Sequence, residues 1–88
     1  MINPSSPPET HIRGRAALSD LRPGQSGRVY QAPDLPLLAA LGVRPGKQLH
    51  YIARSLWRGP LVCRIEERTF VIAAELAASI LLDLTDAS

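Results

Sequence analysis

Hydrophobic and polar residues alternate along several short segments of the chain. In residues 48–54, Leu49, Tyr51 and Ala53 fall on one side of an extended backbone, and the intervening side chains fall on the other. Alternation with a period of two residues is typical of a strand with one buried face. The same reasoning predicts five short strands, at residues 27–31, 48–54, 61–65, 69–73 and 80–84.

Two segments follow a helical pattern instead. Residues 35–41 place leucines three positions apart, which gathers them on one face of a helix of about two turns. Asp34 is the predicted N-cap, and Gly42 suits the left-handed residue that ends a helix. A shorter helical turn is predicted at residues 74–79.

Tight turns separate the predicted strands. The tripeptide Arg-Pro-Gly occurs at residues 22–24 and again at 44–46, and proline followed by glycine favours a type II turn. Short strands joined by such turns, with only two short helices, indicate a mainly β fold. We expect a small antiparallel barrel, whose closure would remove exposed sheet edges. The residues expected to face its core are Val29, Leu38, Leu41, Leu49, Tyr51, Leu61, Cys63, Ile65, Phe70, Ile72, Leu76, Ile80 and Leu82.

The N-terminal segment offers little material for a core. Its first eight residues include three prolines, which cannot donate backbone hydrogen bonds. Ordering this segment would cost conformational entropy with little burial in return. We expect a disordered N-terminal tail at residues 1–16, one folded domain at 17–85 and a short C-terminal tail at 86–88.

Composition excludes several classes of protein. The chain has 88 residues and a formal net charge of +2, which allows one small core but no large enclosed cavity. Cys63 is the single cysteine, so no internal disulfide can form, and a reducing compartment is indicated. No signal peptide and no apolar run near the roughly 20 residues of a membrane span is present. We therefore expect a cytoplasmic protein without direct membrane insertion.

No arrangement typical of an enzyme or of a nucleic-acid binder is present. The sequence lacks a nucleophile elbow, paired carboxylates and a cysteine–histidine motif. Residues 42–48 resemble a phosphate-binding loop, but the glycine spacing is one residue short and Gln48 replaces the magnesium-binding Ser or Thr. The arginines are scattered and the aromatic residues few. We expect neither catalysis nor a nucleic-acid partner.

Three residues belong to types that bind metals. His50, Cys63 and Glu66 could approach one another in a small barrel, but they lack the close spacing of typical zinc ligands. The alternative is a solvated strand residue at His50 and a core residue at Cys63, because free cysteine is usually buried. No cofactor is required by the sequence, and a divalent metal, iron or zinc, stays an open alternative.

Two segments carry apolar side chains where a small barrel would expose them. The helix at residues 35–41 contains no charged residue, so its outer face is apolar. The loop before residue 61 carries a tryptophan beside an arginine, the residue types favoured at interface hot spots. Exposed apolar patches mark docking sites, although Trp57 could instead cover the end of the barrel. The predicted protein-binding surface comprises Leu37, Ala40, Leu56, Trp57, Arg58, Gly59 and Pro60.

Four motifs follow one another in a fixed order along residues 18–84. They are Leu18-Ser19-Asp20-Leu21-x-Pro23-Gly24-x-x-Gly27-x-Val29, then Leu38-x-x-Leu41-Gly42-Val43-x-Pro45-Gly46, then Gly59-Pro60 before a strand, and Ala74-Glu75-x-Ala77-x-x-Ile80. In this order they resemble the FeoA family, the small ferrous iron transport protein A. The resemblance implies an SH3-like barrel in the cytoplasm.

The resemblance also implies a role and a partner. FeoA proteins accompany FeoB, a membrane iron transporter with an N-terminal GTPase domain, so an accessory or regulatory role in ferrous iron uptake is implied. Similar domains occur at the C-terminus of iron-dependent repressors, but a stand-alone form fits this sequence better. The alternative function is a metal-responsive regulatory domain, in which His50 and its neighbours sense iron or another divalent cation. Family members often carry charges in the helix that is uncharged here. That departure favours an apolar outer face or a homodimer.

Overall fold

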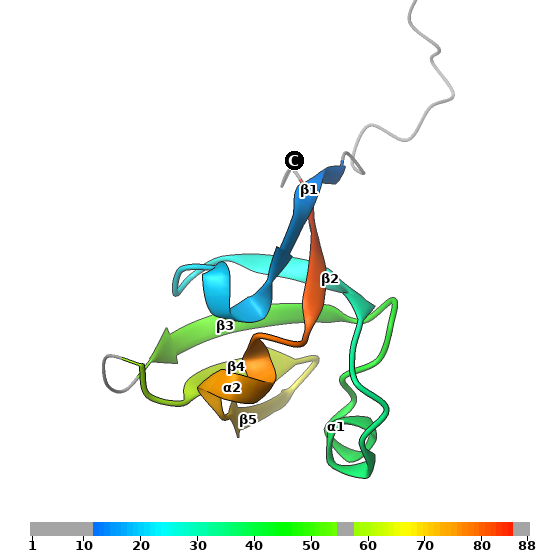
Figure 1. The fold of residues 1–88 in the computed structure, drawn as a ribbon, viewed down its shortest axis with the longest axis vertical. Helices are drawn as coiled ribbons and strands as arrows, with labels where there is room; N and C mark the ends of the chain where they lie inside the picture. The colour runs from blue at the N-terminus through cyan, green and yellow to red at the C-terminus, as the bar shows by residue number, and fades with distance from the viewer. Residues whose placement is uncertain (1–11, 55–57, 86–88) are drawn as a thin grey trace, which may run out of the picture.

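The computed structural model describes residues 12–54 and 58–85, and this part of the chain is mainly β (Figure 1). Its elements are β1 (Ile12–Ala17), the 3-10 helix η1 (Leu18–Asp20), β2 (Ser26–Gln31), α1 (Pro36–Leu41), β3 (Gln48–Arg54), β4 (Leu61–Ile65), β5 (Arg68–Ile72), α2 (Ala74–Ala77) and β6 (Leu81–Thr85). Strands β3 and β4 have the predicted bounds. The other predicted elements differ at their ends by one or two residues.

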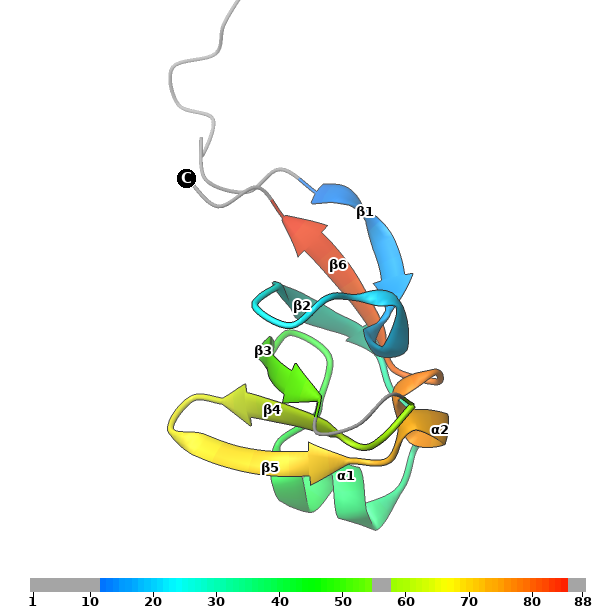
Figure 2. The ribbon, with the colours of Figure 1, turned by 90° about the vertical axis from the view of Figure 1, so that its left-hand side faces the viewer.

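The described strands form a single antiparallel sheet in the order β1-β6-β2-β3-β4-β5. The register shifts by one residue within β1, β2 and β3. Such bulges bend a strand, and the sheet curls around a common core (Figures 1 and 2). Strands β1 and β5 are the two edges of this sheet. We expected a barrel whose sheet closes and leaves no edge strand. For the described residues this expectation is wrong, because no hydrogen-bonded ladder joins β1 to β5.

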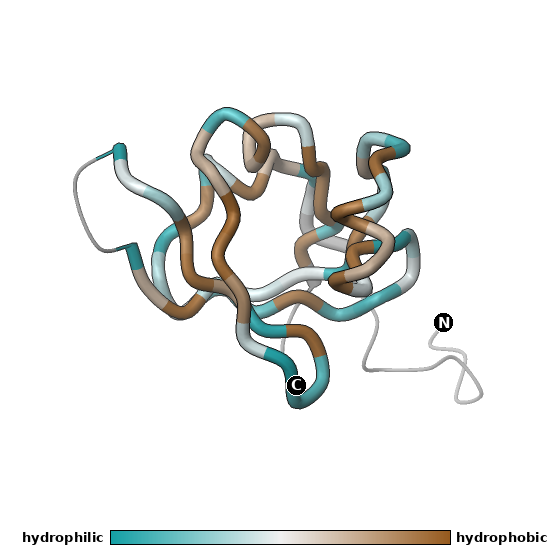
Figure 3. Tube along the Cα trace, turned by 90° about the horizontal axis from the view of Figure 1, so that it is seen from below, coloured by the Kyte–Doolittle hydropathy of each residue, from teal (hydrophilic) through white to brown (hydrophobic). Residues whose placement is uncertain are grey.

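The core lies inside the curled sheet. Hydrophobic and hydrophilic residues alternate along the strands (Figure 3), and the predicted inward residues are buried except Leu41 and Leu76, which pack partly buried against the core. Four further residues complete it, and they lie outside the alternating segments that the prediction used. These residues are Leu18, Leu21, Val43 and Ala77.

Strand β1 corrects the predicted N-terminal tail. Its ladder with β6 aligns Arg15 with Asp83. The Nε of Arg15 donates to Oδ1 of Asp83 at 2.6 Å, and the guanidinium carbon lies 3.6 Å from the centroid of the Tyr30 ring. Residues 12–16 are therefore part of the sheet rather than of a disordered tail, because pairing with a strand distant in sequence orders a segment that has little apolar surface. Residues 1–11 and 86–88 lie outside the described part.

The two helices are short and occupy opposite ends of β3. Helix α1 follows β2, beside the start of β3, whereas α2 follows β5 and contacts η1 (Figure 1). Neither of these helices, the ones in the described ranges, has the length and apolar character needed to cross a membrane.

Candidate protein-docking site

Helix α1 begins with a proline and ends at a glycine. Pro36 occupies the first turn, where its missing N–H has no intrahelical acceptor to lose. The predicted Asp34 cap is wrong, because the N–H of Ala39 bonds to the Leu35 carbonyl oxygen at 3.1 Å and makes Leu35 the N-cap. Gly42 adopts a φ of 87°, so the predicted left-handed ending is confirmed.

The outer face of α1 is apolar and uncharged. Leu37 is 61% exposed and Leu35 41%, whereas Leu38 on the opposite face is buried in the core. Ala40 is also exposed. Among the large hydrophobic residues in the described ranges, Leu37 has the highest exposed fraction. The structure thus exposes both helix residues that the sequence assigned to docking, on a face whose burial against a partner would be favourable.

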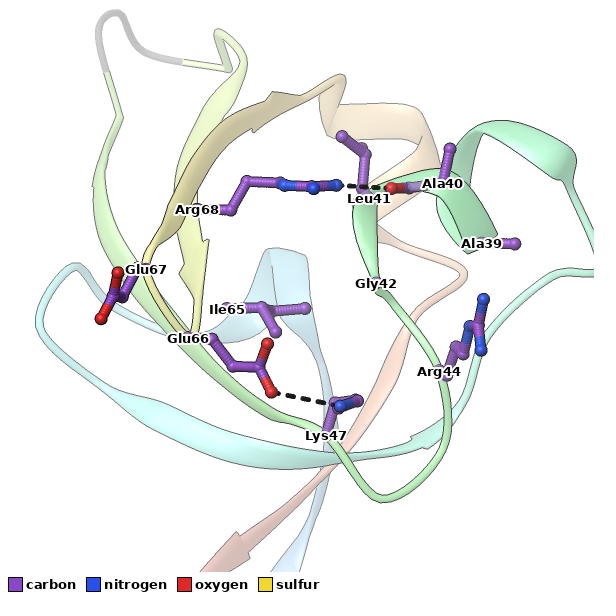
Figure 4. A pocket seen from close by; sticks show the side chains of 10 residues that line it. All are labelled: Ala39, Ala40, Leu41, Gly42, Arg44, Lys47, Ile65, Glu66, Glu67 and Arg68. Atoms are coloured by element: carbon purple, nitrogen blue, oxygen red, sulfur yellow. Dashed lines mark hydrogen bonds and ion pairs between the residues drawn. The ribbon is translucent and has the colours of Figure 1, made fainter.

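A groove of about 760 Å³ separates α1 from the hairpin between β4 and β5 (Figure 4). Leu41 and Gly42 at the end of the helix, together with Ile65 at the end of β4, supply apolar parts of its wall. The hairpin tip reaches the helix because β4 runs antiparallel to β3 and ends where β3 begins. The groove therefore continues the exposed face of α1 toward the hairpin.

Charged side chains cross the groove at two points (Figure 4). Nη1 of Arg68 donates to the Ala40 carbonyl oxygen at 2.6 Å, which places a cation at the C-terminal end of α1, where unpaired carbonyls are negative. Nζ of Lys47 lies 3.2 Å from Oε2 of Glu66. The side chains of Lys47 and Glu66 are 44% and 74% exposed, so solvent screens the ion pair and it adds little stability. Glu67 points away from the groove (Figure 4).

Only the last three residues of the predicted loop, residues 58–60, lie in the part of the chain that the structure describes. Leu56 and Trp57 lie outside the described residues, and Arg58 and Pro60 are exposed while Gly59 is half-buried. Strand β3 begins beside α1 and ends at this loop, so its whole length separates the two segments (Figure 1). Residues 58–60 therefore lie apart from α1, and α1 with the groove is the candidate site in the described part of the chain.

The three possible metal ligands point in different directions. Cys63 is buried opposite Tyr51 on the inner face of the sheet, and His50 is half-buried in register with Arg64 on the outer face. Glu66 is at the hairpin tip. In residues 12–54 and 58–85, no three His, Cys, Asp or Glu residues lie close enough to hold a metal. Burial also raises the pKa of the Cys63 thiol to about 11, which disfavours the thiolate that a metal binds.

Sequence reasoning missed the groove and Arg68. The bond between Arg68 and Ala40 joins residues 28 positions apart, and the pair of Lys47 and Glu66 spans 19 positions. Neither pair has a local pattern. The available signal was the predicted order of strands, because a hairpin after β3 must return its tip to the turn that precedes β3.

Comparison with solved structures identifies the class of fold. The zinc complex of FeoA from Stenotrophomonas maltophilia, described as a prokaryotic SH3 domain protein, gives a TM-score of 0.65 and 23% identity, covering 75% of this chain and 87% of that one. An iron uptake regulatory protein, FeoA, gives a TM-score of 0.71 and 24% identity, covering 80% of this chain and 96% of that one. The fold is therefore a small SH3-like barrel, mainly β with two short helices.

The sequence places the chain within this class. The FeoA domain family matches residues 16–84, and the chain belongs to that family. A manganese-dependent transcriptional repressor shares the fold, with a TM-score of 0.73 and 21% identity. The match covers 91% of this chain and 45% of the repressor chain. Among curated proteins, none matches this chain in sequence.

Proposed function

We propose that this protein is an accessory protein of ferrous iron uptake and that it binds FeoB, the membrane transporter with a GTPase domain, through α1. Membership of the FeoA family supports a role in ferrous iron transport, since this is a family of small accessory transport proteins rather than enzymes. The Stenotrophomonas maltophilia protein has likewise been put forward as an activating factor for bacterial ferrous iron transport.

The exposed face of α1 is the observation that carries this proposal. Leu37 and the N-cap residue Leu35 are exposed on a helix without any charge, next to a groove whose lining combines apolar and charged residues. Burying leucine against a partner contributes about 25 cal/mol per Å² of apolar surface. The charged side chains that line the groove, Arg44 and Lys47 after α1 and Glu66 and Arg68 on the hairpin, would set orientation more than affinity.

A metal-responsive regulatory domain is the alternative from sequence. The likeness to a manganese-dependent repressor, at 21% identity, shows the fold alone. His50, Cys63 and Glu66 do not converge in the structure, so no observation at these positions favours a sensor. A stoichiometric ferrous iron site that is lost in His50→Ala would revive this alternative.

Replacing Leu37 by aspartate tests the docking face. We expect Leu37→Asp to weaken binding to detergent-solubilised FeoB by about 30-fold, the equivalent of about 2 kcal/mol, because a carboxylate would be buried in place of an apolar anchor. Leu37 is largely exposed, so the free energy of unfolding should change by less than about 0.5 kcal/mol. Surface plasmon resonance measures the affinity, and thermal unfolding checks the fold.

Val71→Asp is the matched control for this experiment. Val71 is 57% exposed and lies on β5, away from the outer face of α1, so the same change of charge there should leave FeoB binding unchanged. Equal loss in both variants, or full binding by Leu37→Asp, contradicts docking through α1.

A further inference from the structure

The edge strand β5 leaves part of its backbone without a partner strand. The hairpin between β4 and β5 has a two-residue tip, and its ladder begins with the pair of Ile65 and Arg68. Hydrogen-bonded pairs alternate along an antiparallel ladder, so Arg68, Phe70 and Ile72 exchange bonds with β4. The N–H and C=O groups of Thr69 and Val71 therefore point away from β4, toward an edge beside which no described strand lies.

The two edges of the sheet differ in their protection. Strand β1 carries a register shift, a glycine at Gly14 and a charged Arg15, and such bulges and charges prevent strand pairing between molecules. Strand β5 pairs with β4 in continuous register, and residues 69–73 contain no charge, proline or glycine. Strand β5 carries one charge, Arg68, at its first residue, where the side chain bonds to the Ala40 carbonyl of α1. Residues 69–72 of this edge lack the charges, prolines and bulges that keep an edge strand from pairing.

An apolar row crosses the outer face of β3, β4 and β5. The register aligns Ala53 with Val62 and Val62 with Val71, and partners in a ladder have their side chains on the same face. Val71 is 57% exposed, and Ile52, beside the bulge in β3, is 42% exposed. The row ends at the β5 edge, next to the unpaired backbone groups.

We propose that β5 pairs antiparallel with β5 of a second copy, about a twofold axis at Val71. Val71 then faces Val71 of the second copy, and Thr69 faces Ala73 of the second copy. The N–H and C=O groups of Val71 exchange hydrogen bonds across the axis, because they point to the edge. The two sheets become one, and the two apolar rows become continuous. This interface uses no residue of α1, so it goes beyond the proposed function and does not depend on it.

A second copy of this chain fits the β5 edge because the apolar residues of the edge are complementary to themselves. Pairing about Val71 places apolar row against apolar row, whereas a twofold axis at Thr69 would set Val71 opposite Glu67. An interface of one strand and a few valines is smaller than a standard one, so we expect a dissociation constant on the order of 0.1 mM. The dimer should therefore form at high protein concentration and dissociate on dilution.

Sedimentation velocity of the full chain between about 10 μM and 1 mM spans this constant. The wild type should shift from monomer to dimer over the range. Val71→Asp should weaken the dimer at least tenfold, because two carboxylates would face each other at the axis. Leu37→Asp carries the same charge on α1 and should dimerise as the wild type does. A wild type that stays monomeric, or a dimer lost in Leu37→Asp and kept in Val71→Asp, overturns the proposal.

Amide hydrogen exchange of the wild type needs no substitution and locates the interface. The amides of Thr69 and Val71 should exchange more slowly as concentration rises, while that of Phe70, already bonded to β4, should not change. Concentration-dependent protection at α1 instead of β5 overturns the proposal. Loss of the dimer in Val71→Asp with intact FeoB binding separates this interface from the docking face.

Discussion

Gly27 lies where β2 passes closest to β6. A Cβ atom added at this position would be 2.8 Å from the Asp83 carbonyl oxygen and 3.2 Å from the Cβ of Leu82. The first contact is shorter than side-chain packing allows and is to backbone, which cannot rotate away, and the second is tight. The glycine is therefore required by close approach of two strands rather than by an unusual φ.

Gly27→Ala should destabilise the fold. The β2–β6 ladder would have to separate, and overpacking of this kind costs about 1–3 kcal/mol. Thermal or denaturant unfolding measures the loss. Arg28→Ala, a neighbouring exposed position on the same strand, is the control and should change stability by less than about 0.5 kcal/mol. Equal stability of Gly27→Ala and wild type would mean that the two strands have room to move apart.

Because of Cys63, the free energy of unfolding should depend on pH in the alkaline range. Burial raises the pKa of its thiol from 9.0 to about 11. Folding thus favours the neutral thiol. Its contribution to the free energy of unfolding is complete below about pH 9 and is lost as the pH rises through 11. The free energy of unfolding should fall by about 2 kcal/mol more in the wild type than in Cys63→Ala between these values. Parallel pH profiles of the two proteins would show that the thiol is not buried in solution.

At the scale of elements, α1 is too short to be stable alone. Its six residues are held by the buried Leu38, by the glycine ending at Gly42 and by the bond from Arg68 to the Ala40 carbonyl. Isolated helices of this length are not stable in water, so the hairpin contact helps to fix the orientation of the docking face.

Arg68→Ala should loosen α1 without unfolding the sheet. One exposed hydrogen bond is worth about 1 kcal/mol or less, so the amides of Ala39 and Gly42 should exchange several-fold faster. Exchange measured by nuclear magnetic resonance gives the effect. Arg64→Ala removes a cation from the outer face of β4 and is the control. Unchanged exchange in Arg68→Ala would show that the contact does not restrain the helix.

The elements that could be predicted are those defined by residues close to one another in the sequence. Alternation defined β3 and β4 to the residue, and the proline and glycine around residues 36–42 defined α1. Strand β1 was missed because its sequence has little apolar alternation and its order depends on pairing with β6, such as Arg15 with Asp83. The groove was missed for the same reason, since Arg68 meets Ala40 only after the sheet has formed.

At the scale of the whole molecule, the apolar surfaces lie apart. The α1 face and its groove occupy the end of the barrel where β3 begins, and the row of Ala53, Val62 and Val71 lies on the outer face of the sheet. The loop that includes Arg58 lies at the other end of β3. The groove includes Arg68, the first residue of β5, so a partner in the groove would approach one end of this strand, whereas Val71 lies outside the groove lining.

Hydrogen exchange of this protein with and without detergent-solubilised FeoB tests whether FeoB binds at α1 and the groove. We expect residues 36–47 and 65–68, which form α1, the following turn and the hairpin tip, to exchange more slowly in the complex, while the outer face of β3 and β4 is unaffected. Protection confined to the region of Arg58, or no protection anywhere at saturating FeoB, would contradict this expectation.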